Sequence, residues 1–408
     1  MSVPAARIAG MTETPSTDAL PASWPWLEKL VGIDTTSRDS NLPLIELVAE
    51  RVRGLGLEPQ IFHDDGGTKA NLIVTVPAAD GSRSGGVMLS GHTDVVPVDG
   101  QKWQSDPFTA TVRDGRVYGR GTCDMKAFSA VALTLLPQFV EAELAQPLHL
   151  ALSYDEEVGC LGGAQIVKQI ADLGLAPRLC VVGEPTTMQV IRAHKSINVL
   201  RIVFTGVAAH SSLTPQGVNA IEYAARFVTT ARRMADDWRE NGPFDEAYPV
   251  PYTTMSVNRI DGGIAQNTVP DRCVVEMEFR SIAAVEPTDV VDRLRTTVDD
   301  LRASMQAENP AADAELEILA MVPGLDTPAD AAAIGDVAAW GGVPSEGKVT
   351  YGTEAGQFSG SGIETVVCGP GDIAQAHAAD EYVELAQIEE CEAFMSRLLA
   401  HLSQGGEA

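Results

Sequence analysis

Five stretches of the sequence place acidic or imidazole side chains directly after a short apolar run. In an α/β fold the carboxyl ends of the strands form one rim, and ligands bind at that rim. Five such stretches on one rim would bring two imidazoles and several carboxylates together. The side chains concerned are His92 and Asp94 in "VMLSGHTDVVP", Asp124 in "GRGTCDMKAF", Glu156 and Glu157 in "SYDEEVG", Glu184 in "CVVGEPT" and His377 in "DIAQAHAADEY".

This set of donors is typical of a site for two divalent metal ions. Imidazole nitrogens and carboxylate oxygens are zinc ligands, and a carboxylate can bridge two ions. Two ions about 3.5–4 Å apart can hold water and polarise a carbonyl oxygen together. Taken singly, each stretch has a plainer interpretation, because polar residues at strand ends often cap loops and helices. The five stretches together favour the metal site.

The adjacent acids Glu156 and Glu157 indicate two different roles. On an extended segment, neighbouring side chains point to opposite sides. On a turn, one carboxylate can bind metal while the other faces the attacking water. The second carboxylate can then act as general base and afterwards pass the proton to the leaving amine.

The elements that must position these residues alternate along the chain. Alternating helices and strands indicate an α/β domain with a mostly parallel sheet and helices on both faces. The hydrophobic pattern predicts helices from 24 onward and over 42–59, 125–143 and 162–174, and strands over 71–78, 85–92, 148–157 and 179–186.

Between about 192 and 322 the predicted order changes to strand, helix, two strands, helix and strand. This is the order of a ferredoxin-like α+β sandwich, inserted into the first domain. We therefore expect a discontinuous catalytic domain over 24–191 and 323–408, an inserted domain over 192–322 and a mobile tail over 1–23.

Composition narrows the range of partners. The 408 residues include 56 acidic and 29 basic side chains, for a net charge of -27. Such a surface repels phosphate backbones and anionic lipid, so nucleic acid and membranes are poor partners, whereas cations are favoured. The six cysteines form no C-x-x-C pair, the N-terminal stretch has no apolar segment of signal-peptide length, and no run approaches the roughly 18 apolar residues of a membrane span. We expect a soluble cytoplasmic protein.

The five motifs resemble those of the M20 family of metallopeptidases and deacylases, in the same order. One departure is Ala127, where the family usually has glycine after "DMK"; we expect it to alter packing more than chemistry. The resemblance implies two divalent ions, with zinc favoured and cobalt accepted. It implies His92 and His377 as terminal ligands on separate ions, Asp124 as the bridging ligand, Glu157 and Glu184 as the remaining ligands, Asp94 as the residue that orients His92, and Glu156 as the general base.

The resemblance also implies a homodimer. In M20 deacylases the inserted lid domain pairs with its copy across a two-fold axis, and the histidine of the "AHSS" stretch reaches the partner's active site to hold the oxyanion. That histidine is His210 here. Its plainer interpretation is a loop histidine before a helix cap, since Ser211, Ser212 and Thr214 are capping residue types.

Three stretches look most like the M20 enzymes that deacetylate N2-acetyl-L-ornithine, among them "KVTYGTEAGQFSG". Glu354 in that stretch could pair with the ornithine ammonium, although a loop acid at a turn is an alternative. Arg280 could clamp the α-carboxylate. Asn267 resembles the family's substrate-contacting asparagine, and the role of Lys195, near the lid hinge, stays open between surface and catalytic.

Two other functions remain open at this point. One is a different M20 deacylase, acting on succinyl-diaminopimelate or on N-acyl amino acids in general. The other is a catalytically inactive, metal-dependent binding protein on the same fold. The second is disfavoured because the general base and every metal ligand of the motifs are present.

Overall fold

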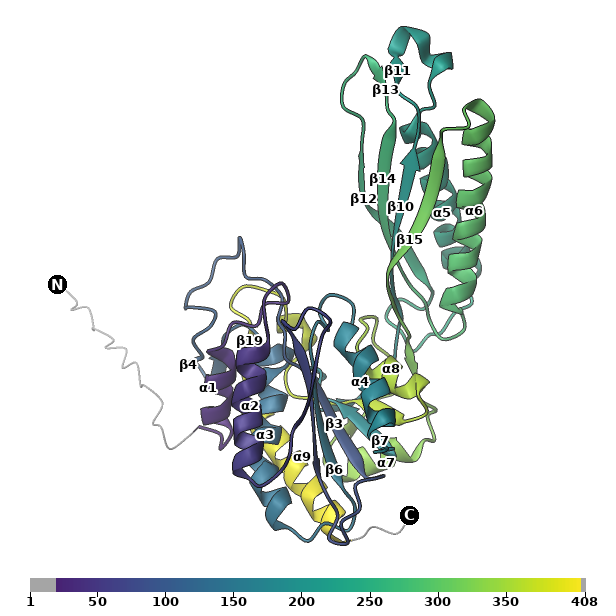
Figure 1. Ribbon diagram of the computed structural model, residues 1–408. Helices are drawn as coiled ribbons and strands as arrows, with labels where there is room; N and C mark the ends of the chain where they lie inside the picture. Colours follow the sequence, from purple (N-terminus) through teal and green to yellow (C-terminus); the bar gives the residue numbers. More distant parts are fainter. Residues whose placement is uncertain (1–19, 405–408) are drawn as a thin grey trace, which may run out of the picture.

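The computed structural model describes residues 20–404, so the tail expected over 1–23 lies almost wholly outside the described residues. The described chain forms two lobes, an α/β domain and a smaller antiparallel insertion that projects from one side of it (Figure 1). All six cysteines are buried thiols without disulfides. No helix between residues 20 and 404 has the length and apolar character needed to cross a membrane.

The larger lobe is organised around a six-stranded sheet with the order β1-β2-β6-β3-β7-β18. Strands β6, β3, β7 and β18 run parallel, while β1 and β2 pair antiparallel at one edge. The prediction of a mostly parallel sheet is confirmed. The strands are β1 (Gln60–His63), β2 (Ala70–Val76), β3 (Val87–His92), β6 (Leu148–Ser153), β7 (Leu179–Val182) and β18 (Glu364–Val367).

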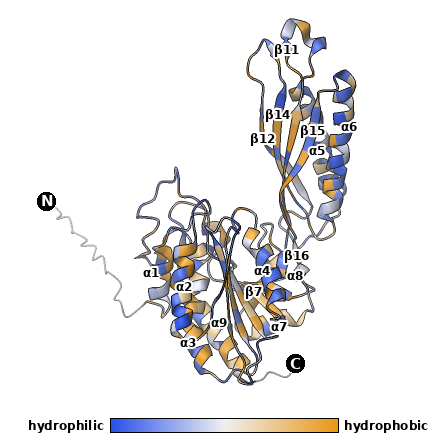
Figure 2. Cartoon of the chain, in the orientation of Figure 1, coloured by the Kyte–Doolittle hydropathy of each residue, from blue (hydrophilic) through white to orange (hydrophobic). Residues whose placement is uncertain are grey.

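Helices cover both faces of this sheet, because alternate strand residues point to opposite sides. In β3, Val87 and Leu89 pack in one core with α1, α2, α3 and α9, whereas Met88 packs in the other with α4 and α8. Ala127 begins α3 and is buried in the first core. Figure 2 shows apolar residues gathered along the strands and on the helices beside them. The helices are α1 (Trp24–Val31), α2 (Leu42–Gly54), α3 (Ala127–Glu141), α4 (Leu161–Asp172), α7 (Ala332–Ala339), α8 (Ala355–Gly360) and α9 (Leu385–Gln404).

The smaller lobe has the predicted ferredoxin-like order β10-α5-β12-β14-α6-β15. Its antiparallel sheet has the strand order β12-β14-β10-β15. Leu200 and Ile202 of β10 and Met277 of β14 pack in one core with α5 and α6, which leaves the other face of the sheet open. The elements are β10 (Ile197–Thr205), α5 (Ala220–Asn241), β12 (Thr254–Gly262), β14 (Arg272–Arg280), α6 (Pro287–Glu308) and β15 (Asp313–Val322).

Two short strands mark where the chain passes between the lobes. β9 (Ala193–His194) leads into the insertion, β16 (Leu325–Asp326) leads out, and the two pair with each other. Both connections therefore leave the α/β lobe side by side. The remaining short elements are β4 (Thr111–Arg113), β5 (Arg116–Tyr118), η2 (Thr122–Lys126), β8 (Gln189–Val190), β11 (Ala209–His210), η3 (Ser211–Gln216), β13 (Thr268–Val269), β17 (Val343–Pro344), η4 (Ile373–Gln375) and β19 (Tyr382–Glu384).

Candidate metal centre and active site

The five predicted motifs meet at one rim of the α/β sheet. Strands β6, β3 and β7 are parallel neighbours, so the loops after their carboxyl ends lie together. η2 and the loop after η4 close the same rim from the side; η2 contacts η4, and Asp124 of η2 contacts His377 of the loop. His92 ends β3, Glu156 and Glu157 lie in the turn after β6, Glu184 follows β7, Asp124 lies in η2 and His377 follows η4.

The Asp124 carboxylate lies between the two histidines. Its Oδ1 is 2.9 Å from His92 Nε2, and its Oδ2 is 3.2 Å from His377 Nε2. Glu157 Oε2 lies 3.0 Å from His377 Nε2, and Glu184 Oε1 lies 3.7 Å from His92 Nε2. A carboxylate that turns one oxygen toward each imidazole has the placement needed to bridge two ions.

The donor atoms can be grouped in more than one way. Those of His92, Asp124 and Glu157 lie within 4.8 Å of one another, and Glu156 joins a second such group with His92. The ion-pair distances instead divide the donors into one set around His92 and another around His377. We favour the second division because it gives each ion an imidazole, a common zinc ligand, and leaves Glu156 beside the site.

The cluster is short of positive charge. Burial raises the pKa of Glu156 and Glu184 well above the usual range, and burial together with Asp124 raises the pKa of Glu157 to about 7. Despite its own burial, Asp124 keeps a low pKa because both histidines hydrogen-bond to it. Hydrogen bonds to Asp124 and Glu157 raise the pKa of His377 to about 10. Divalent cations would supply the missing charge, so these donors fit the two metal ions.

Asp94 holds the turn that carries the two adjacent acids. Its Oδ1 accepts a hydrogen bond from the Glu156 N–H (3.1 Å), and its Oδ2 accepts one from the Glu157 N–H (3.3 Å). Ser37 Oγ also donates to Oδ2, at 2.7 Å. His92 Nδ1 lies 2.9 Å from the Asp94 carbonyl oxygen but 3.6 Å from Oδ1. The Asp94 main chain therefore orients His92, while the carboxylate shapes the turn.

Replacing Asp94 with asparagine is expected to lower metal affinity about 10–100-fold, the usual cost of losing a group that orients metal ligands. The NH2 group of the asparagine side chain cannot accept a hydrogen bond from a backbone N–H group of the turn. Titration with Zn²⁺ against a chromogenic chelator measures the change. Asp99→Asn in the same loop is the control, because its exposed carboxylate pairs with Arg38. Equal affinities in the two variants would contradict this role.

A cavity of about 380 Å³ opens between the carboxylate cluster and the base of the insertion. From the α/β lobe it is lined by Tyr351 and by the cluster residues other than His92, and residues of β10, β14 and β15 line it from the other side. Arg280 of β14 is among them. A guanidinium at the wall of such a cavity can hold a carboxylate through two parallel hydrogen bonds.

A family comparison agrees with this geometry. Residues 88–401 match peptidase family M20/M25/M40. The chain belongs to peptidase family M20. With the His, Asp and Glu donors gathered at the rim, it is an M20 metallohydrolase.

Individual relatives cover nearly the whole M20 chain. It is 37% identical over 392 residues to a Myxococcus xanthus protein named acetylornithine deacetylase, covering 95% of this chain and 99% of the relative. A Proteus mirabilis protein of the same name is 35% identical over 372 residues, covering 90% and 91%. Among solved structures, an M20 family metallo-carboxypeptidase from Sulfolobus solfataricus matches with a TM-score of 0.72 at 16% identity, covering 92% of this chain and 98% of the other. The last likeness shows the fold.

Two buried residues that the sequence does not single out support the M20 metal site. Glu381 Oε1 accepts hydrogen bonds from the backbone N–H groups of Cys123 (2.9 Å) and Asp124 (3.1 Å). Arg120 forms a buried ion pair with Glu381 and donates to Gln101 Oε1. The pair thereby fixes the backbone that carries the central carboxylate. The sequence feature that could have identified Glu381 is its place four residues after the histidine in "AHAADEY".

Glu354 does not face the cavity, and the structure corrects the expectation that it reads the substrate ammonium. Its side chain is 1% exposed and accepts a hydrogen bond from Ser90 Oγ at 2.6 Å. It packs against α4, where a Cβ added to Gly163 would lie 3.0 Å from its Oε2. Burial also raises the pKa of Glu354. The carboxyl group therefore hydrogen-bonds to β3 from the α4 side of the sheet and does not contact the cavity.

His210 and Asn267 lie together at the far tip of the insertion, where β11 pairs with β13 (Figure 1). The Ser211 N–H donates to the Asn267 carbonyl oxygen at 2.9 Å. The imidazole of His210 is exposed, and its Nδ1 lies 2.8 Å from Ser212 Oγ. Within one chain the structure does not bring these two residues to the metal site.

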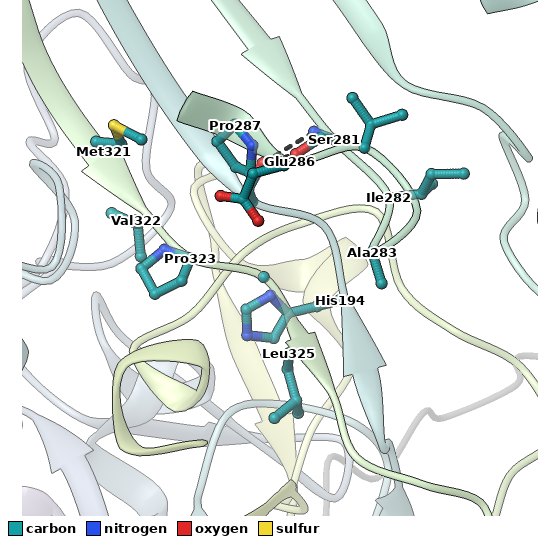
Figure 3. Close-up of a pocket in the computed structure, with 13 residues that line it drawn as sticks. His194, Ser281, Ile282, Ala283, Glu286, Pro287, Met321, Val322, Pro323 and Leu325 are labelled. Atoms are coloured by element: carbon teal, nitrogen blue, oxygen red, sulfur yellow. Dashed lines mark hydrogen bonds between the residues drawn. The ribbon is translucent and has the colours of Figure 1, made fainter. Parts of the chain in front are cut away.

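A second cavity, of about 310 Å³, lies at the junction of the lobes (Figure 3). None of the predicted site residues lines it. His194 contributes to its wall, with its ring nitrogens close to the Lys195 carbonyl oxygen and to Thr353 Oγ1.

Lys195 is itself buried, and its Nζ donates a hydrogen bond to the Tyr252 carbonyl oxygen. A surface role for this lysine is therefore wrong.

Proposed function

We propose that this M20 hydrolase removes the acetyl group from N2-acetyl-L-ornithine, giving L-ornithine and acetate, a step of arginine biosynthesis. The observation that carries the proposal is the likeness to two proteins named acetylornithine deacetylase, at 37% and 35% identity over 95% and 90% of this chain. The cavity supports it, because the cavity joins the hydrolytic cluster to Arg280, which can hold an α-carboxylate.

Two divalent ions belong to this proposal, with zinc as the first choice and cobalt accepted by the same donors. His92, Asp124 and Glu184 would hold one ion. His377, Asp124 and Glu157 would hold the other. This division follows the ion-pair distances. When bound, the ions polarise the amide carbonyl and lower the pKa of water.

Glu156 is the general base of the proposed reaction. Its carboxylate lines the cavity and lies 3.3 Å from the Cys160 thiol. It accepts a proton from the attacking water as the new C–O bond forms. It then delivers that proton to the amide nitrogen as the C–N bond breaks. The second proton of the water also ends on the amine, so acetate and the protonated amine result and no further reactant is needed.

A second copy of the chain completes the proposed site. The exposed position of His210, at the tip of the insertion and away from its own metal site, supports a role in another subunit. In a homodimer built through the inserted domain, His210 donates a hydrogen bond to the oxyanion. Asn267 lies beside it and contacts the substrate from the same tip. A two-fold axis gives each active site one such pair.

A panel of N-acyl amino acids tests the substrate. We expect kcat/KM for N2-acetyl-L-ornithine to exceed that for N-acetyl-L-methionine about tenfold or more, because an ammonium suits an acidic cavity. N-succinyl-L,L-diaminopimelate should be poorer still, since it adds two carboxylates and the cavity wall also carries the acid Glu278. Release of the free amine measures all three. Faster succinyl cleavage would assign a desuccinylase, and no turnover by the metal-loaded protein would favour a binding protein.

A further inference from the structure

The lid side of the active-site cavity carries one acidic side chain, Glu278, that the catalytic proposal does not use. Alternate residues of β14 point to opposite faces of the sheet. Met277 and Phe279 pack in the core with the helices of the insertion, so Glu278 and Arg280 lie on the open face. Both line the cavity. A negative and a positive charge therefore lie side by side on the same wall.

The pairing of these two side chains leaves one edge of each for a ligand. Arg280 Nε donates to Glu278 Oε1. Within residues 20–404, no hydrogen bond engages the Nη atoms of Arg280 or the Oε2 atom of Glu278. The Nη atoms can still hold a carboxylate, and Oε2 can still accept a hydrogen bond from a cation.

Glu276, two residues earlier on the same strand face, is engaged differently. Its Oε1 accepts hydrogen bonds from Nε and Nη2 of Arg201, at 3.1 and 3.0 Å. Arg259 lies 3.6 Å from its Oε2. Glu276 does not line the active-site cavity. It is therefore a matched control for Glu278, with the same side chain on the same strand but with partners inside the insertion.

We propose that Glu278 selects N-acyl amino acids whose side chain ends in a cation. It accepts a hydrogen bond from that cation while Arg280 holds the α-carboxylate. The inference rests on the proposed deacetylase function and names the residue that reads the ornithine ammonium. The other carboxylates that line the cavity belong to the metal cluster, and Glu354 is buried away from the cavity. Glu278 is the carboxylate left to face the substrate.

The Glu278→Gln variant tests this assignment with two substrates. N2-acetyl-L-ornithine is compared with N-acetyl-L-norleucine, in which a methyl group replaces the ammonium. We expect kcat/KM for acetylornithine to fall about 10–100-fold, the usual cost of a lost charge-assisted hydrogen bond. Acetylnorleucine should be hydrolysed at nearly the wild-type rate. Glu276→Gln should leave both substrates unchanged, and thermal melting checks that both variants fold.

Equal losses on both substrates would overturn the inference, because they would mean that Glu278 acts by orienting Arg280. Unchanged kinetics on both substrates would overturn it as well. The wild-type protein separates this inference from the proposed function. If the wild type hydrolyses acetylornithine no better than acetylnorleucine, the proposed substrate is wrong. If it prefers acetylornithine and Glu278→Gln keeps that preference, only the role of Glu278 is rejected.

Discussion

Replacing Glu156 with glutamine is expected to abolish turnover while metal binding stays nearly intact. Glutamine keeps the size of the side chain but cannot take the proton from the attacking water. Loss of a general base lowers the rate about 10²–10⁴-fold. Metal content, by elemental analysis, and kcat should be measured on the same preparation of the variant.

Glu157→Gln is the matched comparison, because both acids sit on the turn that Asp94 holds. Glu157 lies 3.0 Å from His377, as expected for neighbouring ligands of one ion. The Glu157 variant should therefore lose metal as well as activity. Near-native kcat in Glu156→Gln, or a loss of metal equal to that of Glu157→Gln, would reject Glu156 as the base.

Mixing two inactive variants, His210→Ala and Glu156→Ala, is expected to restore activity. In the proposed homodimer, His210 acts in the partner's site, whereas Glu156 acts in its own. A mixed dimer then holds one site with both defects and one site with neither. Random reassortment makes half of the dimers mixed, so up to about a quarter of native activity should return. Each variant alone should be nearly inactive, because each carries its defect into every site.

A second mixture controls for effects of subunit exchange itself. Glu156→Ala mixed with Glu157→Ala should regain nothing, because both residues lie on one turn of the same chain's site. Exchange is verified by mass-tagging one variant and recovering tagged and untagged chains together. If exchange occurs and the His210 mixture stays inactive, His210 does not act across the dimer. Sedimentation of the wild-type protein at several concentrations measures the dimer directly.

The sequence by itself determined the layers of the molecule and the members of the candidate metal cluster. Apolar spacing records which face of a strand or helix is buried, and this signal is local. It predicted the mostly parallel sheet, the ferredoxin-like insertion and the strand ends at one rim. His92, Glu156, Glu157 and Glu184 come together because parallel neighbouring strands carry their end residues to the same edge. Asp124 and His377 instead reach that edge on η2 and on the loop after η4. The residues gathered there are His92, Asp124, Glu156, Glu157, Glu184 and His377.

Only the tertiary structure decided which charged side chains face the cavity. Glu354 and Glu278 are both acids, yet one is buried behind β3 and the other lines the cavity wall. Glu381 supports the cluster through Asp124, and His210 lies at the opposite end of the insertion. A side chain's surroundings depend on contacts between distant segments, such as the 264 residues that separate Ser90 from Glu354. The periodicity of apolar residues within one element does not indicate which distant segments that element will contact.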